Sequence, residues 1–219
     1  MKNKEFLFQY ALGTLSFTEK YEKCKNTTSE QILTIMAKDD VHIRMAVALN
    51  PHTPAKVLAD LSTDEFVAVR ECTAKNPNTP AGILKNLSRD QSPWVCCGIL
   101  ANPNVRRPLL YNLLKQNKKE VNGLVASHKN TPRDILWILA DNKDVQIRCR
   151  VANNPSTPRG LLIYLSKDPE RRVRALVAKN SRTPKKVLEV LINDKEKAVK
   201  MAVKMNKFYY KYQLYKGLE

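Results

Sequence analysis

Asn50-Pro51-His52-Thr53-Pro54 is the stretch that decides the fold, because it returns in register along the chain. The same pattern stands 26 residues later at 76–80 and again, three further periods on, at 154–158. Degenerate copies occupy the remaining periods at 102–106, 128–132 and 180–184. Copies in strict register identify a tandem repeat, and a period this short is typical of arrays in which each repeat packs only on its neighbours.

Each period holds two short helical patterns. Val57, Leu58 and Leu61 follow the signature at the spacing of one α-helix face. We expect Thr53 to cap this first helix and Pro54 to occupy its first turn. A Ser-x-Asp link then leads into a second run with helical spacing. Two slots are Leu in every copy: 58, 84, 110, 136, 162 and 188, and 61, 87, 113, 139, 165 and 191. The sequence therefore predicts an all-α solenoid of about seven 26-residue two-helix repeats with a stacked leucine core.

The run from Val47 to Arg70 reads Val-Ala-x-Asn-Pro-x-Thr-Pro-x-x-x-Leu-x-x-Leu-Ser-x-Asp-x-x-x-x-Val-Arg. It resembles the leucine-rich repeat variant family and, more loosely, HEAT-type repeats. The resemblance implies a right-handed superhelix of short repeats, each pairing an α-helix with a second short or 3₁₀ helix. Some members of the family carry an N-terminal iron–sulfur module. This chain has only Cys24 in that region, so we expect no cluster and no other cofactor.

The predicted organisation has three parts. Residues 1–24 are expected to form a helical N-terminal cap, residues 25–206 the repeat array, and residues 207–219 a basic and aromatic C-terminal cap or tail. Both ends of a solenoid must be covered to keep the terminal repeats soluble.

The net charge of +17 is concentrated in one half of the chain. Residues 1–100 hold 12 Lys and Arg against 11 Asp and Glu, whereas residues 101–219 hold 26 against 10. This excess is larger than solubility requires, so we expect an anionic partner at the C-terminal half.

Several other classes are disfavoured. No signal peptide and no run of about 18 apolar residues is found, so we expect a soluble cytoplasmic protein, a monomer with no membrane contact. Five cysteines without CxxC spacing match neither a disulfide framework nor a metal site, and we expect packed, reduced thiols. The three histidines have no metal-ligand spacing, and no phosphate loop or nucleophile elbow occurs.

Two polar patterns recur with the repeat. Asp64 precedes Arg70 by six residues, and this spacing returns in later copies. Such pairs form either a charged binding stripe or bridges between neighbouring helices, and we favour bridges. An Asn ladder begins at Asn50 and ends the second helix of most repeats. Since Asn tolerates αL geometry, we expect it to cap that helix by bonding its free carbonyls.

One slot is harder to explain by folding alone. The residue after the Pro of the signature is Ala55, Ala81, Arg107, Arg133, Arg159 and Lys185 in successive copies. Cations at a helix N-terminus oppose the macrodipole at a cost of ~0.3–1 kcal/mol each. Layers about 10 Å apart would place them in a row suited to successive phosphates. The alternative is a solvated face of a basic protein.

The middle of the array departs most from the repeat. Cys96 and Asn122 replace Arg70, and Val105-Arg106 replaces Thr-Pro. Exposed-type slots here hold aromatic residues, which either stack on bases or fill space that the degenerate repeat leaves. The candidate nucleic-acid-binding residues are Arg106, Arg107, Arg133, Arg159, Lys185, Trp94, Tyr111 and Trp137.

The sequence therefore predicts a non-catalytic repeat scaffold that binds an anionic partner, nucleic acid before protein and DNA before RNA. One alternative is an enzyme, because the size, charge and tryptophans resemble helical-repeat alkylpurine DNA glycosylases. Asp134 and Asp141 near Trp137 are the only local candidates for the carboxylate of such an enzyme, and we assign no catalytic residue. A second alternative is an adaptor for an acidic protein, which the same surface would serve.

Overall fold

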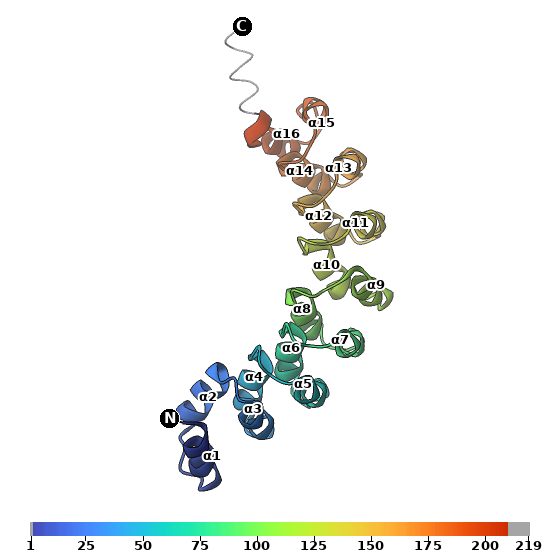
Figure 1. The fold of residues 1–219 in the computed structure, drawn as a ribbon. Coiled ribbons are helices and arrows are strands. Elements are labelled where there is room, and N and C mark those ends of the chain that lie inside the picture. Colours follow the sequence, from blue (N-terminus) through green and yellow to red (C-terminus); the bar gives the residue numbers. More distant parts are fainter. Residues whose placement is uncertain (1, 210–219) are drawn as a thin grey trace. The chain divides into compact units, whose positions relative to one another are not determined.

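A computed structural model describes residues 2–209 of the chain (Figure 1). Every regular element in this range is a helix, which confirms the predicted all-α class. The chain divides into two compact units, residues 1–116 and 117–219, and each is described by itself. Most of the predicted C-terminal cap or tail, from residue 210 onward, lies outside the described residues.

In the first unit, two N-terminal helices precede the repeats. The helices are α1 (Asn3–Ala11), α2 (Phe17–Asn26), α3 (Glu30–Met36), α4 (Val41–Leu49), α5 (Ala55–Leu61), α6 (Val67–Lys75), α7 (Ala81–Leu87), α8 (Pro93–Ala101) and α9 (Arg107–Lys115). From α3 onward, odd-numbered helices are the first helix of a repeat and even-numbered helices the second. The second helices α4, α6 and α8 pack in sequence, and α2 packs on α4 in the same way.

The second unit continues the alternation. Its helices are α10 (Lys119–Ser127), α11 (Arg133–Ala140), α12 (Val145–Asn153), α13 (Arg159–Leu165), α14 (Arg171–Lys179), α15 (Lys185–Leu191) and α16 (Lys197–Lys204). The second helices α10, α12, α14 and α16 again pack in sequence. In both units the two leucine slots are buried in every copy, as the sequence predicts. Each buried leucine contributes about 1.5–3 kcal/mol of transfer free energy to the core.

The signature threonine does not cap the first helix, which corrects the sequence prediction. Pro54 is the N-cap residue of α5 with φ −61° and ψ 146°, and the helix begins at Ala55. The Thr53 hydroxyl instead donates to the Val47 carbonyl at 2.5 Å. That carbonyl lies in the last turn of α4, where carbonyls lack a helical partner, so the buried hydroxyl satisfies the previous helix. The bond recurs at Thr79, Thr131, Thr157 and Thr183.

The Asn ladder is structural, but it does not use the αL geometry that the sequence analysis expects. Asn76 has an extended backbone with φ −64° and ψ 129°. This conformation directs its side chain to the preceding repeat, where Nδ2 donates to the carbonyls of Ala48 at 2.6 Å and Asn50 at 2.7 Å. Its Oδ1 accepts a bond from the Asn78 amide at 2.8 Å. Equivalent bonds to the preceding repeat are made by Asn102, Asn154, Asn180 and Asn206.

The arginine–aspartate pairs also connect successive repeats, as expected, although the partner differs from the one that the spacing indicates. Arg70 Nε lies 2.7 Å from a carboxylate oxygen of Asp90, twenty residues later. Asp64, six residues earlier, offers only its main-chain carbonyl to Arg70, at 2.7 Å. The same bridge is formed by Arg44–Asp64, Arg148–Asp168 and Arg174–Asp194.

Candidate functional site

Three cations of the predicted row occupy equivalent places in the second unit. Arg133, Arg159 and Lys185 are the first residues of α11, α13 and α15, and all three are exposed. We call these three residues the cation row. Arg107 holds the same slot in the first unit, where it begins α9. The sequence therefore places the cations correctly at the start of the first helices, with Arg107 in a different unit from the others.

The members of the cation row differ in their surroundings. Within residues 2–209, Arg133 and Arg159 have neither a hydrogen-bond nor an ion-pair partner. Lys185 lies 3.8 Å from Glu189, one turn further along α15. Exposed pairs of this kind contribute little, so the ammonium stays accessible to another anion. In the first unit, the Arg107 guanidinium lies 6.0 Å from the centre of the Tyr111 ring.

An exposed pair of aromatic rings lies on the same first helices as the cations. The centroids of Trp137 on α11 and Tyr164 on α13 are 5.8 Å apart, with an angle of 52° between the ring planes. Trp137 is 41% exposed and Tyr164 51% exposed. The Tyr164 hydroxyl donates to Asp141 at 2.7 Å, and this bond raises the pKa of the phenol. Trp137 packs over Gly160, where a Cβ atom would lie 3.9 Å from its ring.

Sequence reasoning missed Tyr164, and a comparison of slots would have found it. The outer positions 137–138 and 163–164 hold Trp, Ile, Ile and Tyr, and all four side chains are exposed. The same slots in the first unit hold Ala and Asp at 59–60 and Lys and Asn at 85–86. Large apolar side chains gathered on an exposed face are a sign of a binding surface.

The other two predicted aromatic residues lie in the first unit. Trp94 is 65% exposed at the start of α8, a second helix, and Tyr111 is half-buried on α9, a first helix. Trp137 therefore belongs to a different unit from both, and its ring partner is Tyr164. A joint platform of the three predicted aromatics stays a prediction.

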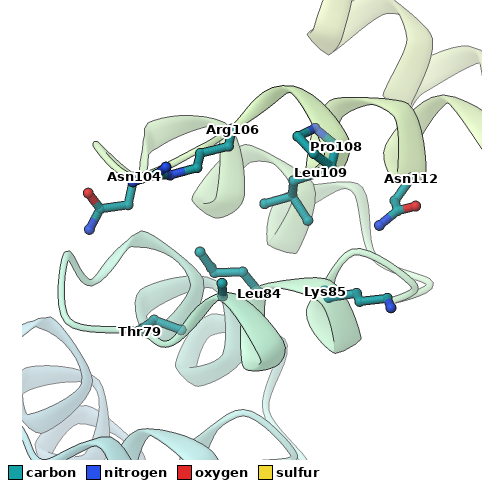
Figure 2. A pocket seen from close by; sticks show the side chains of 9 residues that line it. Thr79, Leu84, Lys85, Asn104, Arg106, Pro108, Leu109 and Asn112 are labelled. Atoms are coloured by element: carbon teal, nitrogen blue, oxygen red, sulfur yellow. The ribbon is translucent and has the colours of Figure 1, made fainter.

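A groove of about 640 Å³ lies between α7 and α9 in the first unit (Figure 2). Its lining comprises Thr79, Ala81, Leu84, Lys85, Asn104, Arg106, Pro108, Leu109 and Asn112. Leu84 and Leu109 face each other across it, with Asn104 and Arg106 toward one end and Lys85 and Asn112 toward the other (Figure 2). Arg106 stands where other repeats have Pro, and its φ of −118° is outside the range of Pro.

Other reactive groups give little indication of catalysis. Burial raises the pKa of the Cys24 thiol to about 12 and that of Cys72 to about 11, so neither is an activated thiolate. Among residues 2–209, no three His, Cys, Asp or Glu side chains are arranged to hold a metal ion. In the same range, no helix has both the length and the apolar character of a membrane span. The Asp141 carboxylate is exposed and accepts the Tyr164 hydroxyl.

Comparison with known proteins identifies the fold. Neither protein-family models nor curated proteins give a match to this sequence. Among solved structures, the chain is similar to one described as a leucine-rich repeat variant with a novel repetitive protein structural motif. The identity is 21% and the TM-score 0.67, and the match covers 93% of this chain and 82% of that one. The chain therefore has the fold of that leucine-rich repeat variant, as the repeat signature predicts.

Proposed function

We propose that this chain, with its leucine-rich repeat variant fold, is a non-catalytic scaffold that binds nucleic acid through its second unit. The observation that carries the proposal is the cation row, Arg133, Arg159 and Lys185, at the same place in successive repeats. Residues 117–219 hold 23 Lys and Arg against 10 Asp and Glu, so the field around the row attracts polyanions.

The spacing of the cation row suits a phosphate backbone. Packed helices lie about 8–10 Å apart, and phosphates recur every ~3.4 Å along one strand of a duplex. One cation per repeat would then meet about every third phosphate. Arg133 and Arg159 have no partner within residues 2–209, so no existing ion pair must be broken when a phosphate binds.

The aromatic pair favours nucleic acid over an acidic protein. Trp137 and Tyr164 present exposed rings on the helices that begin with Arg133 and Arg159. Bases stack on such rings with about 1–3 kcal/mol per base, and stacking requires bases that are accessible, as in a single strand. We propose single-stranded DNA as the preferred ligand, with Arg106, Arg107, Trp94 and Tyr111 of the first unit as further contacts. A cytoplasmic monomer is the state that we propose for this activity.

The test is fluorescence anisotropy of labelled 20-nucleotide single-stranded and duplex DNA and RNA across a salt series. The double variant Arg133→Glu/Arg159→Glu is compared with Lys179→Glu/Lys204→Glu, which makes the same charge change at exposed positions on the second helices α14 and α16. We expect submicromolar binding by the wild type and the control. The row variant should bind at least tenfold more weakly, with a salt slope reduced by about 1.4 for two lost phosphate contacts on a single strand.

Equal loss in both variants would overturn the proposed interface, since it would show only a net-charge effect. Absence of binding to any of the four nucleic acids would overturn nucleic acid as the ligand and favour an acidic protein partner. A glycosylase is the second candidate, because the Asp141 carboxylate lies beside the aromatic pair. That reading requires release of alkylated bases from the duplex, and the release must be lost in Asp134→Asn or Asp141→Asn.

A further inference from the structure

We propose that the groove between α7 and α9 binds an extended peptide segment whose apolar side chain is flanked by acidic residues. The groove lies in the first unit, and the proposal goes beyond nucleic-acid binding by the second. Its volume of about 640 Å³ falls within the range of about 300–1,000 Å³ that is typical of ligand sites.

The middle of the groove is aliphatic. Leu84 of α7 and Leu109 of α9 face each other across it, and Ala81 and Pro108 add exposed apolar surface (Figure 2). No aromatic ring belongs to the lining. A flat base would therefore find no stacking partner here, whereas a Leu, Ile or Met side chain matches the aliphatic walls.

The two ends of the groove are cationic. Arg106 lies toward one end and Lys85 toward the other, with the leucines between them (Figure 2). Within the described part of the chain, neither side chain has a hydrogen-bond or ion-pair partner, and no carboxylate belongs to the lining. Charge complementarity therefore selects an occupant with anionic groups on both sides of an apolar one. A fatty acid carries a single carboxylate and would satisfy one end only.

Amide side chains accompany each cation. Asn104 stands near Arg106, and its Nδ2 is held by the Pro77 carbonyl at 2.7 Å. Asn112 stands near Lys85 at the other end. Side-chain amides both donate and accept, so they can bond the main-chain groups of an extended peptide, which lack partners within the peptide itself.

The groove arises where the repeat signature fails. In the neighbouring copy, Thr79-Pro80 leads directly into Ala81, whereas here Val105 and Arg106 replace Thr-Pro and the proline stands two residues later at Pro108. The change supplies a charge at the mouth of the groove and a proline on its wall. A departure from the local rule that creates both features is a sign of function.

The experiment measures binding of fluorescein-labelled nine-residue peptides to the full chain by anisotropy. The panel carries Glu at positions 2, 3, 7 and 8 and Leu, Ile, Met or Phe at position 5. One control peptide has Gln at position 5, and another has Gln in place of every Glu. The protein variants are Arg106→Glu and Lys85→Glu, with Lys75→Glu as a matched charge reversal at an exposed site outside the groove. Circular dichroism verifies that each variant is folded.

We expect the aliphatic acidic peptides to bind the wild type and Lys75→Glu equally, and at least tenfold more weakly to each groove variant and in both control peptides. A diazirine analogue of leucine at position 5 should crosslink within residues 79–112. Binding weaker than about 1 mM across the panel, equal loss in all three variants, or crosslinks outside that range would overturn the proposal.

Competition separates this site from the nucleic-acid surface. A single-stranded oligonucleotide should leave the bound peptide in place, and Arg106→Glu should reduce peptide binding far more than DNA binding. If the oligonucleotide displaces the peptide and Arg106→Glu weakens both ligands alike, the groove is part of the nucleic-acid interface and the peptide proposal is wrong. Failure of DNA binding in Arg133→Glu/Arg159→Glu would leave peptide binding unchanged.

Discussion

The joints between repeats differ between the regular parts of the two units and the stretch where the units divide. In the regular parts, each joint has an arginine–aspartate bridge and an asparagine that bonds the preceding repeat. In the dividing stretch the arginine slots hold Cys96 and Asn122, the aspartate slots hold Gln116 and Asn142, and the ladder slot holds His128. The boundary between the units, 116–117, falls within this stretch.

This difference separates residues that hold the fold from residues that are available for binding. The bridges and the ladder consist of side chains whose polar atoms are occupied by neighbouring repeats. The α7–α9 groove and the Trp137–Tyr164 pair lie beside the stretch where these devices are missing. Asn117, at the boundary itself, has a φ of 49°, a left-handed conformation that Asn tolerates better than most residues. Irregularity in the repeat therefore coincides with the candidate sites.

The comparison predicts its largest effect for the loss of a bridge. Asp168 is buried and accepts Arg148 Nε at 2.8 Å and Nη2 at 3.1 Å. Asp168→Ala leaves a largely buried guanidinium without its carboxylate, and we expect about 3 kcal/mol of lost stability in urea unfolding. Asn142→Ala removes the same slot one repeat earlier, where the side chain accepts only the Asp144 amide among the described contacts. The expected loss there is about 1 kcal/mol or less. Equal losses would show that the bridges do not distinguish the joints.

The ladder should have the next largest effect. Asn76→Ala removes two bonds to the preceding repeat and leaves the carbonyls of Ala48 and Asn50 buried without that donor. We expect a loss of about 2 kcal/mol, measured by urea unfolding. The exposed neighbour Asn78→Ala is the control, because its amide reaches only the Pro51 carbonyl at the surface. A loss below about 0.5 kcal/mol in Asn76→Ala would contradict a structural ladder.

Most of the fold could be predicted from the sequence because the repeat multiplies every local signal. The leucine slots, the first helices and the stacking of repeats all follow from a hydrophobic pattern repeated in register. Partners across a joint could not be read in the same way. The spacing pairs Asp64 with Arg70 in sequence, whereas the ion pair joins Arg70 to Asp90. A repeat period gives the slot of a side chain but not which copy it contacts.

The candidate site could be predicted in part. Arg133 and Arg159 stand out because cations at a helix start oppose the local dipole. Tyr164 and the α7–α9 groove did not, because neither breaks a rule of residue type in its own helix. Tyr164 is visible only when equivalent outer slots are compared between the units. The groove depends on how Arg106 and Pro108 redirect the start of α9, and that is a property of backbone geometry.

A restored bridge should sharpen the comparison in the opposite direction. Asn122→Arg/Asn142→Asp places the regular pair in the first joint of the second unit, where Asn122 Oδ1 is buried and accepts no bond from the described residues. We expect a gain of about 1 kcal/mol in urea unfolding, with each single variant neutral or destabilising. Additive single effects in this double-mutant cycle would mean that the two side chains do not meet.

The bridges should also make stability depend on pH. The hydrogen bond from Arg174 lowers the pKa of Asp194 in the folded chain, so its stabilising contribution is present above the ordinary carboxyl pKa. This contribution is lost as the pH falls through the lowered value. We expect Asp194→Asn to melt at a lower temperature than the wild type at pH 7, and the difference to shrink at pH 2.5. A difference that is unchanged between the two pH values would exclude Asp194 as the titrating group.

The smallest effect on stability is expected at the cation row. Arg159 is exposed at the start of α13 and has no partner within residues 2–209, so Arg159→Glu removes no structural contact. It also replaces a cation with an anion at a helix N-terminus, which the macrodipole favours. We expect the stability in urea to change by less than about 0.5 kcal/mol while DNA binding weakens severalfold. Destabilisation by about 2 kcal/mol would place Arg159 with Asp168 and Asn76 among the residues that hold the array, and the row would no longer be a surface available to a ligand.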